Sequence, residues 1–173
     1  MIDMTSGVIT PEQMPSLVPF MSRDSFLGIY PETAIEYAHT PEKGDCHYFL
    51  APCMLYGTPC RLALCFDREQ GLAEVRFSVS DRPADGPAEQ DGVERPVSKS
   101  WRPQEESALK ALNDQFLISH CGFTKKDRGK GGDLMRKTPF GTMRSFFDAK
   151  GCSSDIVLTY QKPDDSRQPE KRV

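Results

Sequence analysis

The sequence lacks three features that would place it in other classes of protein. No apolar run approaches the roughly 18 residues of a membrane span, so we expect no membrane partner. The 173 residues carry a formal net charge of −3, whereas a nucleic-acid binder usually carries a clear basic excess, so we expect no nucleic-acid partner. There is also no internal repeat and no low-complexity tract. The length suits one domain with a real core.

A secretory signal is also missing from the first thirty residues. Such a signal begins with basic residues and continues with an apolar block, but Asp3 and Glu12 lie where that block would be. We therefore expect a cytoplasmic protein. The alternative is a periplasmic protein whose native signal peptide has been removed.

The cysteines do not have the spacing of a common metal or redox motif. No two of the six are separated by two residues, so neither a zinc ribbon nor a thioredoxin-like site is predicted. The chain is also too long to need disulfides for its stability. We expect small, mostly buried, reduced thiols. The six are Cys46, Cys53, Cys60, Cys65, Cys121 and Cys152.

The three histidines, His39, His47 and His120, have no metal-ligand partner at local spacing. Cys46 and His47 are adjacent, and adjacent side chains in a strand point to opposite faces, so these two are not expected to share an ion. We therefore predict no metal site, no cofactor and no catalytic site. A nucleophile pair assembled in space, such as Cys121 with a distant histidine, stays open as an alternative.

Strands are indicated where apolar and polar residues alternate. Residues 47–50, 61–66 and 72–79 form a meander of such segments. Clean alternation indicates that one face packs on a core and the other face meets water, as in antiparallel sheets.

The stretch of residues 141–160 predicts a terminal hairpin that is central to stability. Two runs with a two-residue period flank residues 148–154, which supply the Asp, Gly and Ser that favour turns. We expect Ile156, Leu158 and Phe147 to be largely buried.

A short helix is predicted over about residues 23–29, because Ser22 is a good cap and Pro31 stops the helix. Residues 10–13 also have the pattern of a helix start, with Thr10 as the cap and Gln13 completing a capping box.

The strongest helix signal covers about residues 103–120. A proline in the first turn, acidic residues after it and Gly122 at the end all fit this assignment. Leu109, Leu112 and Phe116 recur at helical spacing, so we expect them to cover the sheet.

Together these elements predict an α+β fold in a single domain of residues 1–161. An antiparallel sheet of about five strands would carry the long helix on one face, and short helices would precede the sheet. The tail, residues 162–173, is expected to be disordered.

Two charged segments show no apolar period. The acidic segment, residues 81–100, is predicted to be a long loop. The basic segment, residues 124–138, is rich in lysine, arginine and glycine. It lacks the Walker pattern of a phosphate loop and the aromatics of a single-strand binder, so a solvated loop is predicted.

Three places in the chain together resemble one protein family. Residues 7–11 (GVITP) and 21–26 (MSRDSF) are similar to its G-x-I-T-P opening and its M-[ST]-R-x-x-F helix start. Residues 60–79 resemble its central hairpin. Residues 139–160 are similar to its closing pattern, W-G-x-v-x-S-x-x-D-x-K-x-x-x-S-x-I-x-x-x-Y, with Phe140 in place of the Trp. The family comprises small bacterial proteins considered to be immunity proteins of contact-dependent and type VI secretion toxin systems.

The resemblance implies an immunity protein that binds a cognate toxin, encoded next to it, and neutralises that toxin by occlusion. None of the shared motifs is catalytic, and we expect the chain not to be an enzyme. Two other functions stay open. One is a small envelope or periplasmic binding or assembly protein of related layout, and the other is a small enzyme with a Cys/His site assembled in space.

The acidic segment is the first candidate for the partner-binding surface, because spread carboxylates suit a toxin with a basic cleft. The basic segment would suit an acidic partner instead, and the sheet face or an edge strand is a third choice. The carboxylates proposed for partner binding are Asp85, Glu89, Asp91 and Glu94.

Overall fold

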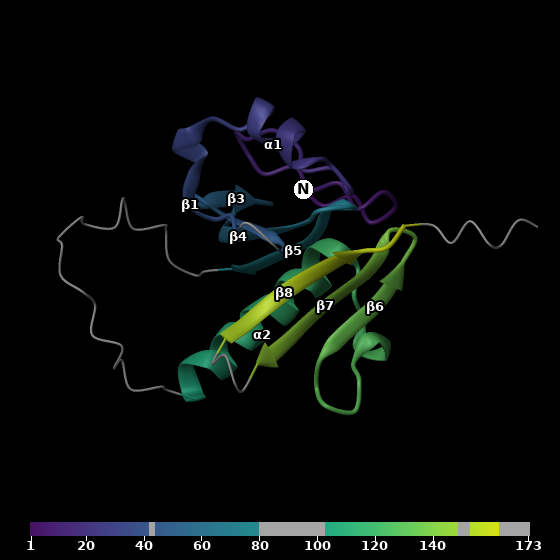
Figure 1. The fold of residues 1–173 in the computed structure, drawn as a ribbon. Helices are drawn as coiled ribbons and strands as arrows, with labels where there is room; N and C mark the ends of the chain where they lie inside the picture. The colour runs from purple at the N-terminus through teal and green to yellow at the C-terminus, as the bar shows by residue number, and fades with distance from the viewer. Residues whose placement is uncertain (42–43, 80–102, 149–152, 163–173) are drawn as a thin grey trace, which may run out of the picture.

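The fold is organised around one antiparallel sheet. A computed structural model describes residues 1–41, 44–79, 103–148 and 153–162. Within these ranges the sheet has eight strands, seven of them in the order β1-β2-β4-β5-β8-β7-β6, while β3 pairs with the first part of β4 (Figure 1). The strands are β1 (Ile35–His39), β2 (Cys46–Leu50), β3 (Cys53–Leu55), β4 (Thr58–Asp67), β5 (Gly71–Val79), β6 (Leu134–Thr138), β7 (Gly141–Asp148) and β8 (Ser153–Tyr160).

The helices are α1 (Arg23–Ile29) and α2 (Pro103–Cys121), with short 3-10 turns η1 (Glu32–Ala34) and η2 (Lys125–Asp127). The mixed α and β class, the antiparallel sheet and the helices predicted over about residues 23–29 and 103–120 are confirmed. The expectation of about five strands is wrong, because β1, β3 and β6 were not anticipated. None of the helices in the described ranges has the length and apolarity that crossing a membrane requires.

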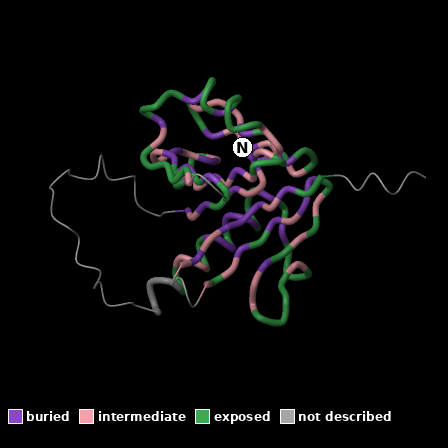
Figure 2. Tube along the Cα trace, in the orientation of Figure 1, coloured by how far each residue is buried: buried purple, intermediate pink, exposed green. Residues whose placement is uncertain are grey.

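One face of the sheet forms the core. A row of directly paired residues crosses five strands: Leu62, Phe77, Ile156, Ser145 and Leu134. All five are buried, and their neighbours along each strand point the other way. Figure 2 shows this alternation of buried and more exposed positions along the strands. The register therefore collects most of the buried apolar side chains of the strands on a single face.

The N-terminal residues and α1 cover the half of the core face that lies over β1 to β5 (Figure 1). Phe26 of α1 is fully buried, and its ring packs against Tyr30, Tyr48 and Phe66 at centroid distances of 4.7, 5.1 and 5.2 Å. The Ser22 hydroxyl caps this helix by accepting from the Ser25 amide at 3.1 Å. The predicted short helix is confirmed with its predicted bounds.

The helix start predicted at residues 10–13 is wrong. The Thr10 hydroxyl bonds the Ser16 hydroxyl at 2.9 Å instead of capping a turn, and Gln13 has a φ of 62°, outside the helical region. The backbone of Ile9 pairs with that of Leu17 in an antiparallel bridge. Pro15 and Pro19 keep this stretch from continuing as a helix, so it forms an extended cover.

Helix α2 covers β5, β8 and β7 on the same core face (Figure 1). Phe116 is buried and Leu109 is half-buried, but Leu112 is 37% exposed, so its predicted place on the sheet is wrong. The buried position one residue later is Asn113. Its side chain accepts from the Val79 amide at 3.1 Å and donates to a carbonyl of β8 at 3.0 Å. The helix therefore turns a polar residue toward the strand ends.

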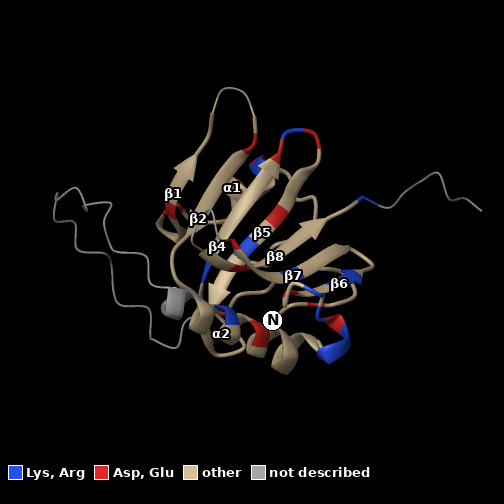
Figure 3. Ribbon diagram, turned by 90° about the horizontal axis from the view of Figure 1, so that it is seen from below, with Lys and Arg blue, Asp and Glu red and all other residues tan. Residues whose placement is uncertain are grey.

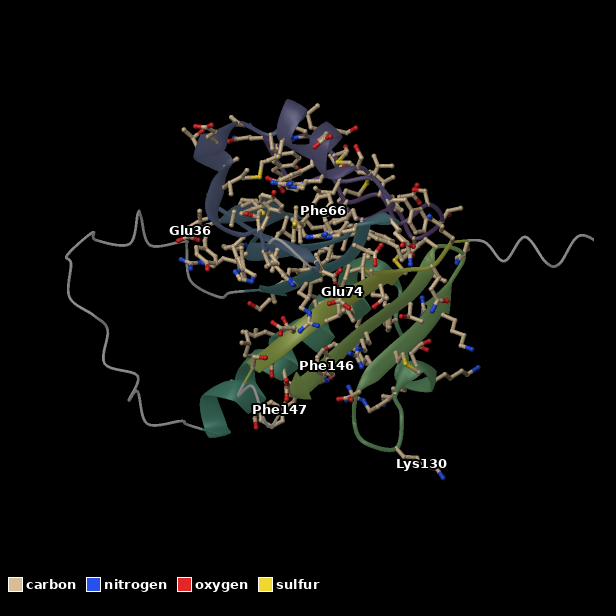
Figure 4. All side chains as sticks on the ribbon, viewed as in Figure 1. Glu36, Phe66, Glu74, Lys130, Phe146 and Phe147 are labelled. Atoms are coloured by element: carbon tan, nitrogen blue, oxygen red, sulfur yellow. The ribbon has the colours of Figure 1, made fainter. Side chains whose placement is uncertain are left out.

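The predicted hairpin exists as β7 and β8, and Ile156 and Leu158 are fully buried as expected. Phe147 is 37% exposed, so the expectation that it is buried is wrong. It shares a face with Met143 and Ser145 but lies at the end of β7 (Figure 4), beside a hollow that residues of α2 and the basic segment also line. The packing of α2 on the sheet therefore does not bury Phe147.

Candidate partner-binding face

The second face of the sheet is the candidate functional site, because both helices and the N-terminal residues pack on the first. No other described segment lies across it. We call it the open face. Its side chains come from seven strands and alternate with the buried row. Its members include Tyr37, His39, His47, Phe49, Arg61, Ala63, Cys65, Glu74, Arg76, Ser78, Met135, Lys137, Thr142, Arg144, Phe146, Asp155, Val157 and Thr159.

The open face contains a hollow of about 480 Å³. Residues from β1, β2, β4, β5 and β8 line it, so no single segment of the chain forms it. A hollow of this size admits a side chain of a partner protein. The open-face residues around it are His47, Phe49, Arg61, Ala63, Arg76, Ser78 and Asp155, and Glu36 of β1 closes one side.

An exposed aromatic pair lies at one edge of the open face. Tyr37 and Phe49 are directly paired across β1 and β2, and their ring centroids are 5.7 Å apart. Their exposed fractions are 58% and 43%. Water-exposed aromatic rings of this kind are enriched at protein–protein interfaces.

The open face carries two ion pairs in which the arginine is more exposed to water than the carboxylate. Arg76 is paired with Glu74 at 2.6 Å, and the arginine side chain is 50% exposed against 20% for the glutamate. Arg61 lies 3.8 Å from Glu36, with exposed fractions of 61% and 40%. Lys/Arg and Asp/Glu positions lie next to one another across the middle strands in Figure 3. In both pairs the guanidinium group is more exposed than its carboxylate partner.

Val157 of β8 and Arg144 of β7 lie in line with Arg76 across the open face. Val157 is fully buried although it belongs to the open face, between its strand partners Arg76 and Arg144. Arg144 in turn lies over the Phe146 ring at 4.2 Å. Figure 4 shows Glu74 at the centre of the sheet and Phe146 on β7. The arginine stems shield the middle of the face from water.

Asp155 lines the hollow and has a perturbed carboxyl group. Burial raises the pKa of its carboxyl above the ordinary value, and the Ser153 hydroxyl, which donates to it at 3.2 Å, offsets part of that shift. Arg76 acts in the same direction as Ser153. A carboxyl perturbed by burial in a cleft marks a candidate binding position.

The carboxylates that the sequence put forward for partner binding, Asp85, Glu89, Asp91 and Glu94, lie outside the described residues. Their role stays a prediction. The predicted tail is outside them as well, apart from Lys162.

The basic segment is not the solvated loop that the sequence predicted. It forms η2 and β6, and two of its cations make internal ion pairs. Arg136 binds Asp127 at 2.7 Å and lies 4.4 Å from the Phe123 ring. Arg128 binds the buried Asp114 of α2 at 3.0 Å. The segment is thus attached to the helix and the sheet, while Lys130 projects from its loop (Figure 4).

The cysteines and histidines do not form a metal-binding group in the described ranges. No group of three or more His, Cys, Asp or Glu residues there is arranged to hold a metal ion. Cys46 is buried and His47 exposed, as their adjacency in a strand predicted. Burial raises the pKa of Cys65 to about 11 and that of Cys121 to about 12. Such thiols are poorly ionised and are weak nucleophiles.

Sequence reasoning anticipated part of the open face and missed its edge. The outward positions of β4 and β5, such as Arg61 and Arg76, were predicted to meet water. Tyr37 and His39 were missed, because β1 was not recognised as a strand. The sequence signal that could have predicted this strand is the alternation of Ile35, Tyr37 and His39.

Comparisons with family models, with curated proteins and with solved structures find no match to this chain.

Proposed function

We propose that the chain is a protein-binding module that acts as an immunity protein, and that the open face contacts the toxin it neutralises. The observation that carries the proposal is the exposed Tyr37–Phe49 pair beside outward-facing arginines. Aromatic residues and arginine are the side chains that most often dominate the energy of protein interfaces. The resemblance of residues 7–11, 21–26 and 139–160 to immunity proteins supports the same role.

The chemistry of the open face favours a partner that presents a carboxylate. Among the residues that the structure describes, Arg61 is held by a single contact of 3.8 Å, with Glu36, and it keeps most of its surface in water. It lies at the rim of the hollow, which Arg76 also lines. An acidic side chain of the toxin entering the hollow would receive charge-assisted hydrogen bonds from these guanidinium groups. Phe49 and Ala63, which also line the hollow, would help to exclude water from these contacts.

An immunity protein must stay bound for as long as the toxin persists. This requires a dissociation constant in the nanomolar range or below, which corresponds to about −12 kcal/mol or stronger. An interface of roughly 1,600 Å² is the usual size for such complexes. The open face spans seven strands and offers a surface on which such an interface is feasible.

The experiment uses the toxin-like protein encoded beside this gene as the probe. Phe49→Asp, on the open face, is compared with Leu27→Asp on α1, because the two wild-type side chains are 43% and 41% exposed. Helix α1 lies on the covered side of the sheet (Figure 1). We expect Phe49→Asp to weaken binding by about 30-fold or more, the effect of a hot-spot residue, and to reduce protection of growth. Leu27→Asp should leave both unchanged.

Two outcomes contradict the proposal. If the neighbouring protein neither binds the chain nor is neutralised by it, the immunity role is wrong. If it binds and both variants retain full affinity, the role stands but the open face is not the contact surface. Circular dichroism and thermal melting of each variant show whether it is folded.

A further inference from the structure

Two cysteines are directly opposed in the hairpin that β3 and β4 form. The turn consists of Tyr56 and Gly57, whose φ values are 52° and 69°. Positive φ at both central residues is typical of a type I′ turn. Counting outward from this turn, Leu55 pairs with Thr58 and Cys53 pairs with Cys60. The two sulfur atoms lie 3.4 Å apart.

The register supports this placement independently. In an antiparallel pair, hydrogen-bonded positions alternate with positions whose backbone groups point outward. Pro59 has no amide hydrogen and lies at the intermediate position opposite Met54. The Met54 carbonyl points outward and accepts from the Glu12 amide at 2.9 Å. The pair Cys53–Cys60 therefore lies at a hydrogen-bonded position, where Cα atoms are about 5.5 Å apart, a separation that suits a disulfide.

The surroundings hold the pair in register. Both side chains are buried. The hairpin is fixed from outside by Glu12, whose carboxylate accepts from the Gly57 amide at 2.7 Å, and by Tyr56, whose hydroxyl bonds the backbone of Ile2 at 2.8 and 3.0 Å. Among the five described cysteines this is the one pair whose sulfur atoms are in contact.

We propose that Cys53 and Cys60 form an intramolecular disulfide when the chain meets a small-molecule disulfide such as oxidised glutathione, and that Cys46, Cys65 and Cys121 stay thiols. The inference concerns the folded chain itself and does not rest on the proposed immunity role. It identifies a modification site and makes the folded protein able to exist in two covalent forms.

The chemistry is an ordinary thiol–disulfide exchange. The hydrogen bond with Cys60 lowers the pKa of Cys53, so the Cys53 thiolate attacks one sulfur of oxidised glutathione and releases one reduced glutathione. The Cys60 thiol, whose pKa is raised by the same hydrogen bond, loses its proton and attacks the Cys53 sulfur. It releases the second glutathione. Two protein thiols are oxidised, and one glutathione disulfide is reduced to two thiols.

The test refolds the full chain from denaturant in a buffer of oxidised and reduced glutathione, so that burial of the pair does not limit access. Free thiols are then alkylated under denaturing conditions, and the mass of the chain is measured. Chymotrypsin cleaves after Leu55 and Tyr56, which separates Cys53 from Cys60 unless they are linked. We expect two thiols fewer than in reduced protein and one linked pair of peptides.

Variants make the assignment specific. Cys60→Ser should abolish the link, and Cys121→Ser, the matched change at another buried cysteine, should leave it intact. The linked form should melt about 5 °C above the reduced form, because the link closes a short loop in the unfolded chain. A full set of free thiols in refolded wild type, glutathione adducts in place of the link, links to other cysteines, or a lower melting temperature of the linked form would overturn the proposal.

Discussion

The hydroxyl of Tyr160 donates a hydrogen bond to the carbonyl oxygen of Gly7 at 2.9 Å, and so joins two residues 153 positions apart. Phe140 lies beside both residues: its ring is 6.0 Å from that of Tyr160, and its side chain lies against Gly7. All three lie in the stretches on which the sequence-based prediction of an immunity protein rests. The opening and closing motifs thus meet in one buried contact, which gives them a structural role in fixing the N-terminal residues to the end of the sheet.

Gly7→Ala should destabilise the protein by about 2–4 kcal/mol. Gly7 has a φ of +76°, and a Cβ atom there would lie 2.6 Å from Cγ of Phe140. Gly28→Ala in α1 is the control, because nothing lies within 4 Å of its Cβ position. That change should stabilise by about 0.5–1 kcal/mol. Urea unfolding measures both, and equal effects would show that the contact with Phe140 is not tight.

Leu158→Ala should cost about 2–5 kcal/mol of unfolding free energy, since Leu158 is fully buried between Val75 and Met143. Phe147→Ala removes a larger side chain, but one that is 37% exposed, so about 1 kcal/mol is expected. Urea unfolding of the two variants provides the measurement, and Leu158→Ala should have the lower midpoint. A larger loss for Phe147 would mean that the end of β7 is part of the core.

Local sequence patterns predict most strands of the sheet. They do not predict the two edge strands, β1 and β6. The two-residue period located β2, β4, β5, β7 and β8, because each has a neighbour on both sides or a continuous buried face. The edge strand β1 has an exposed pattern after Ile35. The other edge, β6, reads Leu-Met-Arg-Lys-Thr, with one buried residue. Their strand character comes from pairing with a distant partner, which single-sequence patterns do not contain.

The candidate site was harder to predict than the fold, since its residues come from segments far apart in the chain. Arg76 and Asp155 line one hollow but are separated by helix α2 and two strands. Sequence reasoning identified the water-facing side of the meander. It did not show that β8 inserts beside β5 and places Asp155 there. That placement depends on the strand order of the whole sheet.

The pH dependence of stability should change in Asp155→Asn. Burial raises the pKa of Asp155 in the folded state, so the folded protein holds this proton more tightly than the unfolded chain. Stability from this group is present below the ordinary carboxyl pKa of about 3.9 and is lost as the pH rises through the higher folded pKa.

Asparagine does not ionise, and its side-chain oxygen can still accept from Ser153. The variant should therefore lack this loss and be the more stable protein at pH 7. Unfolding free energies of both proteins between pH 3 and pH 7 provide the measurement. A difference that does not grow with pH would contradict the raised pKa.

Removing the charge of Asp85, Glu89, Asp91 and Glu94, by changing each to Asn or Gln, should slow association with the neighbouring toxin at low salt. Carboxylates that steer a basic partner act over long distances, so they raise the association rate, by 10-fold or more, and salt screens the effect. The dissociation rate should change little, in contrast to Phe49→Asp, which removes a short-range contact and should act on dissociation.

The control for this experiment removes four carboxylates elsewhere, Asp24, Glu32, Glu69 and Asp133, so that the net charge changes equally. If the control slows association as much, net charge rather than the acidic segment steers the partner. If neither variant slows association at low salt, the acidic segment is not the steering surface. The association rates at low and high salt thus test whether the acidic segment steers the proposed toxin.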